Sequence, residues 1–254
     1  MAKRGLEMAP SNSSSNAERA ARIMLALGDS GVDGCSLAAL AQTLGEAKSP
    51  VHRALTALST FGFVEQADRR GQYRLGPAIY ALANRTLSAA ETVPMFRPAL
   101  VRVSAETGHT SYLMARSGLD SVCLDFQIGS SPVQPLLDGV GGRLPLGVGL
   151  GGVSILAGLD DKTGETILSL NEPLYGRWGI ERSVIEADIG LARAQGFVVS
   201  ARPATPGVVT LSLPVPQRRG VQAAVSVMMM ADEANEDRIA LVRAAIERAL
   251  SLID

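Results

Sequence analysis

The feature that most constrains this chain is a pattern of two short helices and a hairpin between residues 36 and 75. Ser36 is a suitable N-cap for the first helix. The apolar positions of that helix recur at helical spacing and are Leu37, Leu40, Ala41 and Leu44. Gly45 interrupts the pattern, and a second helix begins near Ser49 with Pro50 in its first turn, where proline is tolerated. The pattern predicts a helix-turn-helix.

The second helix has two different faces. Val51, Leu55 and Leu58 fall on one side. The opposite side carries polar side chains, namely Ser49, His52, Arg53, Thr56 and Thr60. The apolar face can pack on the first helix while the polar face presents hydrogen-bond donors outward. A helix that enters the DNA major groove requires this arrangement, so we expect Ser49, His52, Arg53 and Thr56 to contact base edges.

A basic hairpin follows the second helix. Its strands begin at Phe63 and at Tyr73, and residues 68–71 form the turn between them. Between Lys48 and Arg74 there are five Lys or Arg and two acidic residues, a balance of +3 in a chain whose net charge is −1. This hairpin is typical of the wing of a winged helix-turn-helix. The expected contacts to phosphates or the minor groove are Lys48, Arg69, Arg70, Gln72, Tyr73 and Arg74. The alternative is an ordinary solvated helical hairpin with a charged turn.

The run from Ser49 to Gly76, SPVHRALTALSTFGFVEQADRRGQYRLG, resembles the DNA-binding domain of the isocitrate lyase regulator (IclR-type) transcription factors. The family usually has Ser-Thr-Val-His-Arg at the start of this helix, and Pro50 here replaces the threonine, which removes a hydroxyl and a backbone donor. The resemblance implies a small winged helix, a linker helix that contributes to dimerisation, and a larger ligand-sensing domain. It also implies a homo-oligomer, a dimer or a dimer of dimers, on a palindromic operator in double-stranded DNA.

Length and patterning predict this domain organisation in a chain of 254 residues. Residues 1–16 read as a disordered tail, residues 17–75 as the winged helix-turn-helix, residues 76–89 as the linker helix, and residues 90–254 as the effector-binding domain. Pro77 can open the linker helix. Its apolar positions are Ile79, Leu82, Ala83 and Leu87.

Several classes of protein are disfavoured. There is no apolar run long enough for a membrane span and no signal-like segment, so the chain reads as cytoplasmic. Cys35 and Cys123 form no metal-binding motif, and we expect no metal or cofactor. His52 and His109 lie in different predicted domains and there is no nucleophile elbow, so we expect no enzyme. His109 follows a glycine at a predicted helix end, where capping or solvent exposure is expected.

The second domain alternates between helical and strand patterns. Expected strands are 110–115, 122–127, 133–137, 197–200, 208–214 and 223–229, and expected helices are 95–107, 152–159, 163–170, 184–195 and 236–252. Strands in hairpins with helices at both ends predict an antiparallel sheet covered by helices, an α+β fold. The family resemblance implies a GAF/PAS-like effector-binding domain of this kind.

The glycine-rich segment 147–152 has the spacing of a dinucleotide-binding loop. That motif requires a parallel βαβ unit, whereas Pro145 interrupts the preceding run and the neighbouring pattern is antiparallel. We favour another interpretation, in which Gly149 to Gly152 open a helix whose unpaired N–H groups attract an anion.

The family resemblance places an effector pocket in the same region. The family segment Gly-x-Arg-x-Pro-Leu-His-x-Thr-Ala-x-Gly-Lys-Ala matches here at Arg143, Pro145, Leu146 and Gly152, but its His, Thr and Lys are replaced by Gly147, Gly149 and Val153. Expected effector-binding residues are Arg143, Leu146, Gly149, Leu150, Gly151, Gly152, Ser212 and Ser226. The two serines could equally bond to a neighbouring strand. The lost donors favour a small apolar or aromatic mono-acid as effector.

Two functional hypotheses follow. The first is a DNA-binding transcriptional regulator whose operator binding is controlled by a small molecule in the C-terminal domain. The alternative is a small-molecule-binding or metabolic enzyme domain with a vestigial helix-turn-helix head.

Overall fold

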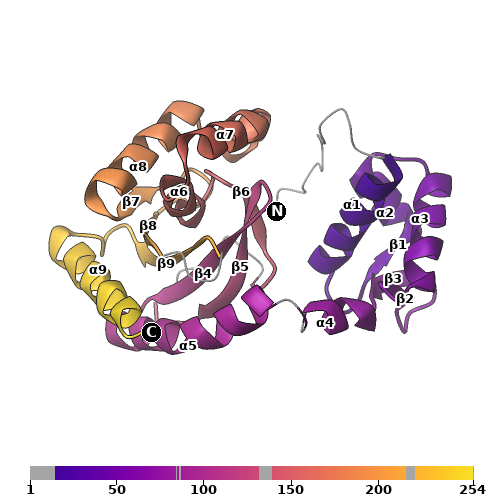
Figure 1. Ribbon diagram of the computed structural model, residues 1–254, viewed down its shortest axis with the longest axis horizontal. Coiled ribbons are helices and arrows are strands. Elements are labelled where there is room, and N and C mark those ends of the chain that lie inside the picture. The colour runs from indigo at the N-terminus through magenta and orange to yellow at the C-terminus, as the bar shows by residue number, and fades with distance from the viewer. Residues whose placement is uncertain (1–14, 84, 86, 132–138, 216–220, 254) are drawn as a thin grey trace. The chain divides into compact units, whose positions relative to one another are not determined.

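The computed structural model describes residues 15–83, 85, 87–131, 139–215 and 221–253. The chain divides into two compact units, residues 1–86 and 87–254, which we describe separately (Figure 1). Most of the expected N-terminal tail and the expected strand at 133–137 lie outside the described residues.

The first unit combines a helix-turn-helix with a small antiparallel sheet. Its helices are α1 (Ser15–Asp29), α2 (Leu37–Leu44), α3 (Lys48–Thr60) and α4 (Pro77–Ala83). Its strands are β1 (Cys35–Ser36), β2 (Val64–Gln66) and β3 (Gln72–Leu75), in the order β1-β3-β2. The Ser36 side chain accepts a hydrogen bond from the Ala39 N–H, and Gly45 ends α2 at a φ of 69°. The predicted N-cap and helix break are therefore confirmed.

Apolar side chains from the helices and the hairpin form the core of this unit. Ile23 and Leu27 of α1 meet Leu40 of α2 and Leu55 of α3, and all four are fully buried. The hairpin contributes Val64, which is 1% exposed. The apolar positions predicted for the two helices of the helix-turn-helix therefore lie in or against the core.

The second unit is built on an antiparallel sheet with the strand order β6-β5-β4-β9-β8-β7. Its strands are β4 (Thr110–Ser117), β5 (Asp120–Gln127), β6 (Arg143–Pro145), β7 (Val198–Ala201), β8 (Val208–Pro214) and β9 (Ala223–Met230). Its helices are α5 (Leu87–Thr107), α6 (Leu150–Ala157), α7 (Asp161–Tyr175), the 3-10 turn η1 (Gly176–Trp178), α8 (Arg182–Gln195) and α9 (Glu236–Ser251). The predicted α+β fold is confirmed.

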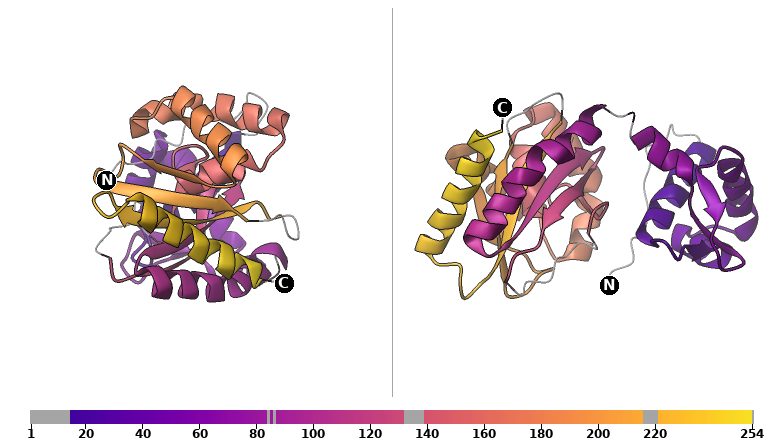
Figure 2. Two further views of the ribbon diagram at one scale, coloured as in Figure 1. Left: turned by 90° about the vertical axis from the view of Figure 1, so that its left-hand side faces the viewer. Right: turned by 90° about the horizontal axis from the view of Figure 1, so that it is seen from below.

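Helices cover both faces of the sheet (Figures 1 and 2). Helices α5 and α9 pack side by side on one face, over a core that includes Leu113, Val225 and Leu211. Helix α6 lies on the other face, with α8 and α7 outside it, over a core that includes Met114 and Ala224. Each strand therefore alternates between two separate apolar cores, as the period of two requires.

The start of the second unit differs from the sequence expectation. A separate helix beginning near residue 95 is wrong, because α5 is one helix from Leu87 to Thr107 with Pro94 and Pro98 inside it. A proline disfavours the interior of a helix, because it removes a backbone hydrogen bond. Packing of α5 on the sheet and on α9 overrides that local preference.

Candidate nucleic-acid interface and effector site

Helix α3 presents two chemically different faces. Val51, Leu55 and Leu58 are 0%, 1% and 8% exposed and pack into the core of the first unit. The predicted contact residues of the opposite face are exposed to solvent, and they are Ser49, His52, Arg53 and Thr56. Because the buried stripe fixes the rotation of the helix, the polar face is presented outward as a unit.

Hydrogen bonds within α3 hold two of these side chains. The Arg53 Nη1 donates to the Ser49 Oγ at 3.1 Å, one turn back along the helix. The Thr56 hydroxyl donates to the His52 carbonyl oxygen at 3.0 Å. Ser49 therefore positions the guanidinium of Arg53, while Thr56, with its hydroxyl donor used, can offer its methyl group to a thymine.

The basic residues of the hairpin fall into two groups. Arg69 and Arg70 are exposed in the turn between β2 and β3, and Lys48 is exposed at the start of α3. Arg74 is held within the hairpin, with its Nε 2.8 Å from the Glu65 Oε1 and its Nη1 3.5 Å from the Asp68 Oδ2. The bond to Glu65 and the charge of Asp68 raise the pKa of Arg74 above its ordinary value.

The other two predicted wing donors are half-buried. Gln72 pairs with Ser36 across the β1–β3 register, and Tyr73 pairs with Cys35. The Tyr73 ring packs against the core of the unit. The turn residues Arg69 and Arg70 are therefore the more exposed cations of the hairpin.

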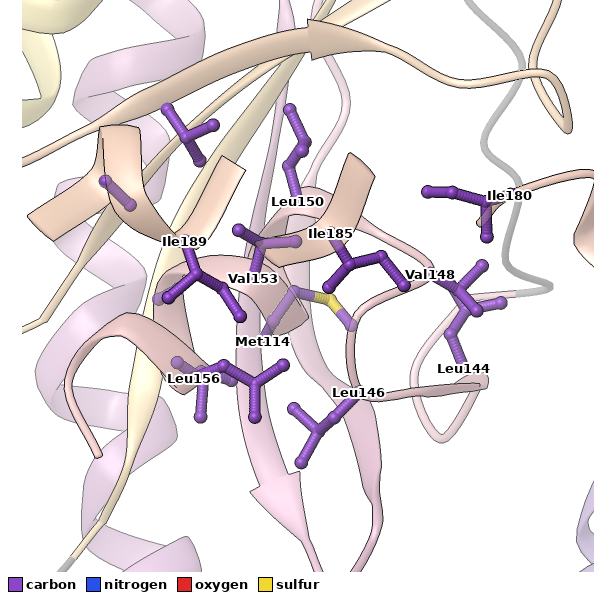
Figure 3. Close-up of a cluster of buried hydrophobic side chains, with 14 of the residues drawn as sticks. Met114, Leu144, Leu146, Val148, Leu150, Val153, Leu156, Ile180, Ile185 and Ile189 are labelled. Carbon is purple, nitrogen blue, oxygen red and sulfur yellow. The ribbon is translucent and has the colours of Figure 1, made fainter. Parts of the chain in front are cut away.

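In the second unit, the glycine-rich segment fills the core between the sheet and α8. Large apolar side chains recur at every second position from 144 to 150, and all four are buried, namely Leu144, Leu146, Val148 and Leu150. Figure 3 shows these side chains around Met114 of β4, Val153 of α6 and Ile185 of α8. The alternation with Pro145, Gly147 and Gly149 is visible in the sequence, and it indicates packing and not a nucleotide loop.

Two glycines of this segment are required by close packing. A Cβ at Gly147, where φ is +105°, would lie 3.0 Å from the Tyr175 hydroxyl and 3.1 Å from Ile185. A Cβ at Gly151 would lie 2.7 Å from the Met114 Cγ and 3.0 Å from the Ser226 Oγ. The backbone at the start of α6 therefore lies directly on the sheet.

Buried polar side chains from distant parts of the chain hold the same segment. The Tyr175 hydroxyl donates to the Leu146 carbonyl oxygen at 2.8 Å, and Asn171 donates to the same oxygen at 3.3 Å. The Arg202 Nε donates to the Val148 carbonyl oxygen at 3.0 Å, while its Nη2 lies 2.7 Å from the Asp188 Oδ2. Sequence reasoning missed this set. The spacing of Asn171 and Tyr175 by one helical turn was a usable signal, whereas nothing local marked Arg202.

The predicted polar contacts of the effector are engaged with the protein. The Arg143 Nε lies 3.2 Å from the Asp120 Oδ2, and its Nη2 donates to the Ser117 Oγ at 3.0 Å. Ser212 accepts from Ser154 of α6 and from Ser226, both at 2.9 Å. The bond between Ser226 and Ser212 joins β9 to β8. These two hydroxyls therefore bond to a neighbouring strand, which is the alternative to binding a ligand that the sequence left open.

Sequence reasoning also missed Tyr112, which lies beside Ser226 in the β4–β9 register. A bulge in the β4–β5 ladder changes which side chains of β5 lie on the same face as Tyr112. Tyr112 and Met114 are two residues apart on β4, whereas their partners Phe126 and Cys123 are three apart on β5. All four side chains consequently share the face covered by α6. The Tyr112 and Phe126 rings stack with centroids 6.1 Å apart.

The hydroxyl of Tyr112 stands out among these groups. Tyr112 is 4% exposed, and its oxygen has no hydrogen-bond partner among the described residues. Burial raises the pKa of Tyr112 to about 12, so the phenol is protonated at neutral pH and can donate. A buried hydroxyl without a partner costs about 1–3 kcal/mol, so its retention calls for an explanation.

The expectation that His109 caps a helix or is solvent-exposed is wrong. His109 is 3% exposed, and within the described part of the chain neither ring nitrogen has a hydrogen-bond partner. Its Nδ1 lies 3.9 Å from the Glu233 Oε2. Desolvation lowers the pKa of His109 below its ordinary value of 6.5, although Glu233 opposes the shift.

The described residues include no helix with the length and hydrophobicity of a membrane span. They also contain no cluster of three or more His, Cys, Asp or Glu side chains that could hold a metal ion.

An exposed polar helix with an adjacent basic hairpin, in one chain with a separate α+β domain, is the architecture of a DNA-binding transcriptional regulator. Residues 16–68 match the IclR helix-turn-helix domain, and residues 84–254 match the family described as bacterial transcriptional regulator IclR C-terminal. The chain belongs to the IclR family. This confirms the hypothesis of a DNA-binding transcriptional regulator.

Relatives and solved structures agree with this assignment. The glycerol operon regulatory protein of Streptomyces griseus is 32% identical over 205 residues, which are 80% of this chain and 79% of that protein. The fold is similar to a putative IclR transcriptional regulator from Silicibacter sp., with a TM-score of 0.73, 21% identity and coverage of 92% of this chain and 94% of that one. It is also similar to an IclR homolog from Microbacterium hydrocarbonoxydans complexed with 4-hydroxybenzoate, with a TM-score of 0.71, 22% identity and coverage of 93% and 99%.

Proposed function

We propose that this chain acts in the cytoplasm as a homo-oligomeric regulator and not as an enzyme, and that it reads a palindromic operator through α3 and the wing. The observation that carries the proposal is the exposed polar face of α3, whose rotation is fixed by the buried Val51, Leu55 and Leu58. A second copy supplies the second half-site, because one winged unit reads only a few base pairs.

The roles of the contact residues follow from their hydrogen bonds and exposure. Arg53, held by Ser49, reads a guanine, and Thr56 offers its methyl group to a neighbouring thymine. His52 lies on the same face. The exposed cations that bind phosphates are Lys48, Arg69 and Arg70. Gln72, Tyr73 and Arg74 support the wing.

The effector proposal rests on which groups near α6 are already paired. Arg143, Ser212 and Ser226 are bonded to protein partners, and Leu146 and Leu150 are buried apolar side chains. The backbone N–H groups at the start of α6 and a largely apolar surround favour one carboxylate on an apolar or aromatic body. The complex of the Microbacterium hydrocarbonoxydans homolog with 4-hydroxybenzoate, an aromatic mono-acid, supports this class.

DNA binding is tested by fluorescence anisotropy with the DNA upstream of the protein's own gene and a shuffled duplex of the same composition. We expect tighter binding to the upstream DNA and a linear fall of log affinity with log salt concentration. Equal affinity for both duplexes at physiological salt would contradict a specific operator.

The effector class is tested by thermal shift with aromatic mono-acids, dicarboxylates and polyols, including the glycerol suggested by the name of the Streptomyces griseus relative. Aromatic mono-acids should raise the melting temperature and change the affinity for the upstream DNA. Stabilisation by dicarboxylates or polyols alone would contradict the proposed class.

A further inference from the structure

The unpaired hydroxyl of Tyr112 contrasts with the other buried hydroxyls on the same face of the sheet. Ser154, Ser212 and Ser226 bond to one another, and Tyr175 bonds to a backbone carbonyl oxygen. Tyr112 is as deeply buried as these groups, yet within the described ranges its oxygen has no protein partner. The hydroxyl of Tyr112 is therefore buried without a hydrogen bond, whereas a phenylalanine at this position would have no hydroxyl to satisfy.

Tyr112 belongs to an aromatic pair on the face of the sheet covered by α6. Its ring stacks on Phe126 with an interplanar angle of 19°. Gly139, where φ is +103°, lies beside the ring of Phe126, since a Cβ at this position would lie 3.6 Å from the Phe126 Cε1. The hydroxyl oxygen of Tyr112 is thus a polar atom at the edge of an aromatic pair.

The orientation of α6 adds a favourable electrostatic environment for an anion. Ser154, in the second turn, bonds to Ser212 on β8, whereas Gly151, in the first turn, lies against Met114 on β4. The N-terminal end of α6 is therefore the end nearest β4, the strand that carries Tyr112. Gly149 caps this end without a side-chain hydrogen bond, and the helix dipole there attracts negative charge.

We propose that Tyr112 is a specificity-determining residue of the effector site. Its hydroxyl donates a hydrogen bond to the carboxylate of an aromatic mono-acid whose ring packs beside Phe126 at the N-terminal end of α6. The assignment rests on the proposed function, since it presupposes an effector at the N-terminal end of α6. It goes further by naming the protein group that distinguishes an acid from a neutral molecule of the same shape.

The test compares Tyr112→Phe with the wild-type protein, using benzoate and its neutral isostere nitrobenzene as probes in isothermal titration calorimetry. We expect the substitution to weaken benzoate binding about ten-fold or more, as loss of a hydrogen bond to a charged group should, and nitrobenzene binding less than about three-fold. Equal losses for both probes, or no loss for benzoate, would overturn the assignment while leaving the effector class intact. Binding of neither probe to the wild-type protein would overturn the assignment and the effector class together.

Urea unfolding of the ligand-free proteins provides a second readout. Tyr175→Phe is the matched control, because it removes a buried phenol oxygen that is bonded within the fold. We expect Tyr175→Phe to lower the unfolding midpoint and Tyr112→Phe to leave it unchanged or raise it. A decrease for Tyr112→Phe as large as that for Tyr175→Phe would show that the fold itself uses the hydroxyl, and would refute the proposal.

Discussion

Arg53, the proposed recognition residue, is held in place by its neighbours on one helix. The bond from its guanidinium to Ser49 restricts a long side chain that would otherwise lose conformational entropy on binding DNA. The buried Val51 and Leu55 fix the direction in which the helix presents that guanidinium. Small local contacts therefore determine which atoms are available to a base edge.

We predict that Arg53→Ala costs about 1–3 kcal/mol on the specific operator and relaxes the base preference. Arg69→Ala is the control, because a phosphate contact should weaken all sequences alike and reduce the salt slope by about one unit. Anisotropy titrations on operator and shuffled DNA at several salt concentrations measure both effects. Equal losses on the two duplexes for Arg53→Ala would show that α3 does not read bases through this residue.

His109 couples the stability of the second unit to pH. Burial lowers its pKa below 6.5, so the folded state keeps the ring neutral where the unfolded chain already takes up a proton. Stability should therefore be lost as the pH falls through 6.5 towards the lowered pKa. Glu233, which lies 3.9 Å away, reduces this loss without abolishing it.

The measurement is the urea midpoint between pH 7.5 and pH 5 for the wild type and His109→Gln, which cannot titrate in this range. We expect the difference between the two proteins to change below pH 6.5, with the wild type losing more. Parallel pH profiles would show that His109 titrates alike in the folded and unfolded states.

At the scale of elements, α6 depends on glycine for its contact with the sheet. Gly151→Ala should destabilise the protein by about 1–3 kcal/mol, because the added methyl group would overlap Met114 and lie against Ser226. Gly190 is the matched control in α8, since a Cβ there has nothing within 4 Å. Gly190→Ala should stabilise by about 0.5–1 kcal/mol through helix propensity. Urea denaturation checks both, and a neutral Gly151→Ala would mean that α6 lies farther from the sheet.

The arginines of the wing hairpin have two different roles. Arg74 pairs with Glu65 on the adjacent strand and with Asp68 in the turn, so this cation braces the hairpin. Arg69 and Arg70 remain exposed at its tip. A count of basic residues cannot separate these roles, because the separation depends on the register of β2 and β3.

At the scale of the whole molecule, the proposed reading of a palindromic operator requires more than one copy of the chain. Helix α4 exposes 51% of Leu82, an apolar residue of the predicted linker. We predict that light scattering shows a dimer or larger species at micromolar concentration, and that Leu82→Glu shifts it towards the monomer and weakens operator binding. Val32→Glu is the control, because Val32 is a more exposed apolar residue, at 82%, outside the linker. A monomeric wild-type protein would count heavily against the proposed assembly.

The sequence by itself determined the elements whose pattern is local. The caps and breaks at Ser36 and Gly45, the two faces of α3 and the α+β alternation follow from periodicity and turn chemistry within about ten residues. The family resemblance added the sensing domain. The same local reasoning placed the start of α5 near residue 95 and not at Leu87, because packing on the sheet and on α9 holds the helix together across Pro94.

Only the tertiary structure decided which polar groups are already paired. Arg143, Ser212 and Ser226 looked available to a ligand because their partners, Asp120 and Ser154 among them, lie 13 or more residues away in the chain. Tyr112 looked like an ordinary strand residue for the same reason. Whether a buried polar group finds a hydrogen-bond partner depends on its neighbours in three dimensions. Strand register and the β4–β5 bulge determine those neighbours, and the spacing of residues in the sequence reveals neither of them.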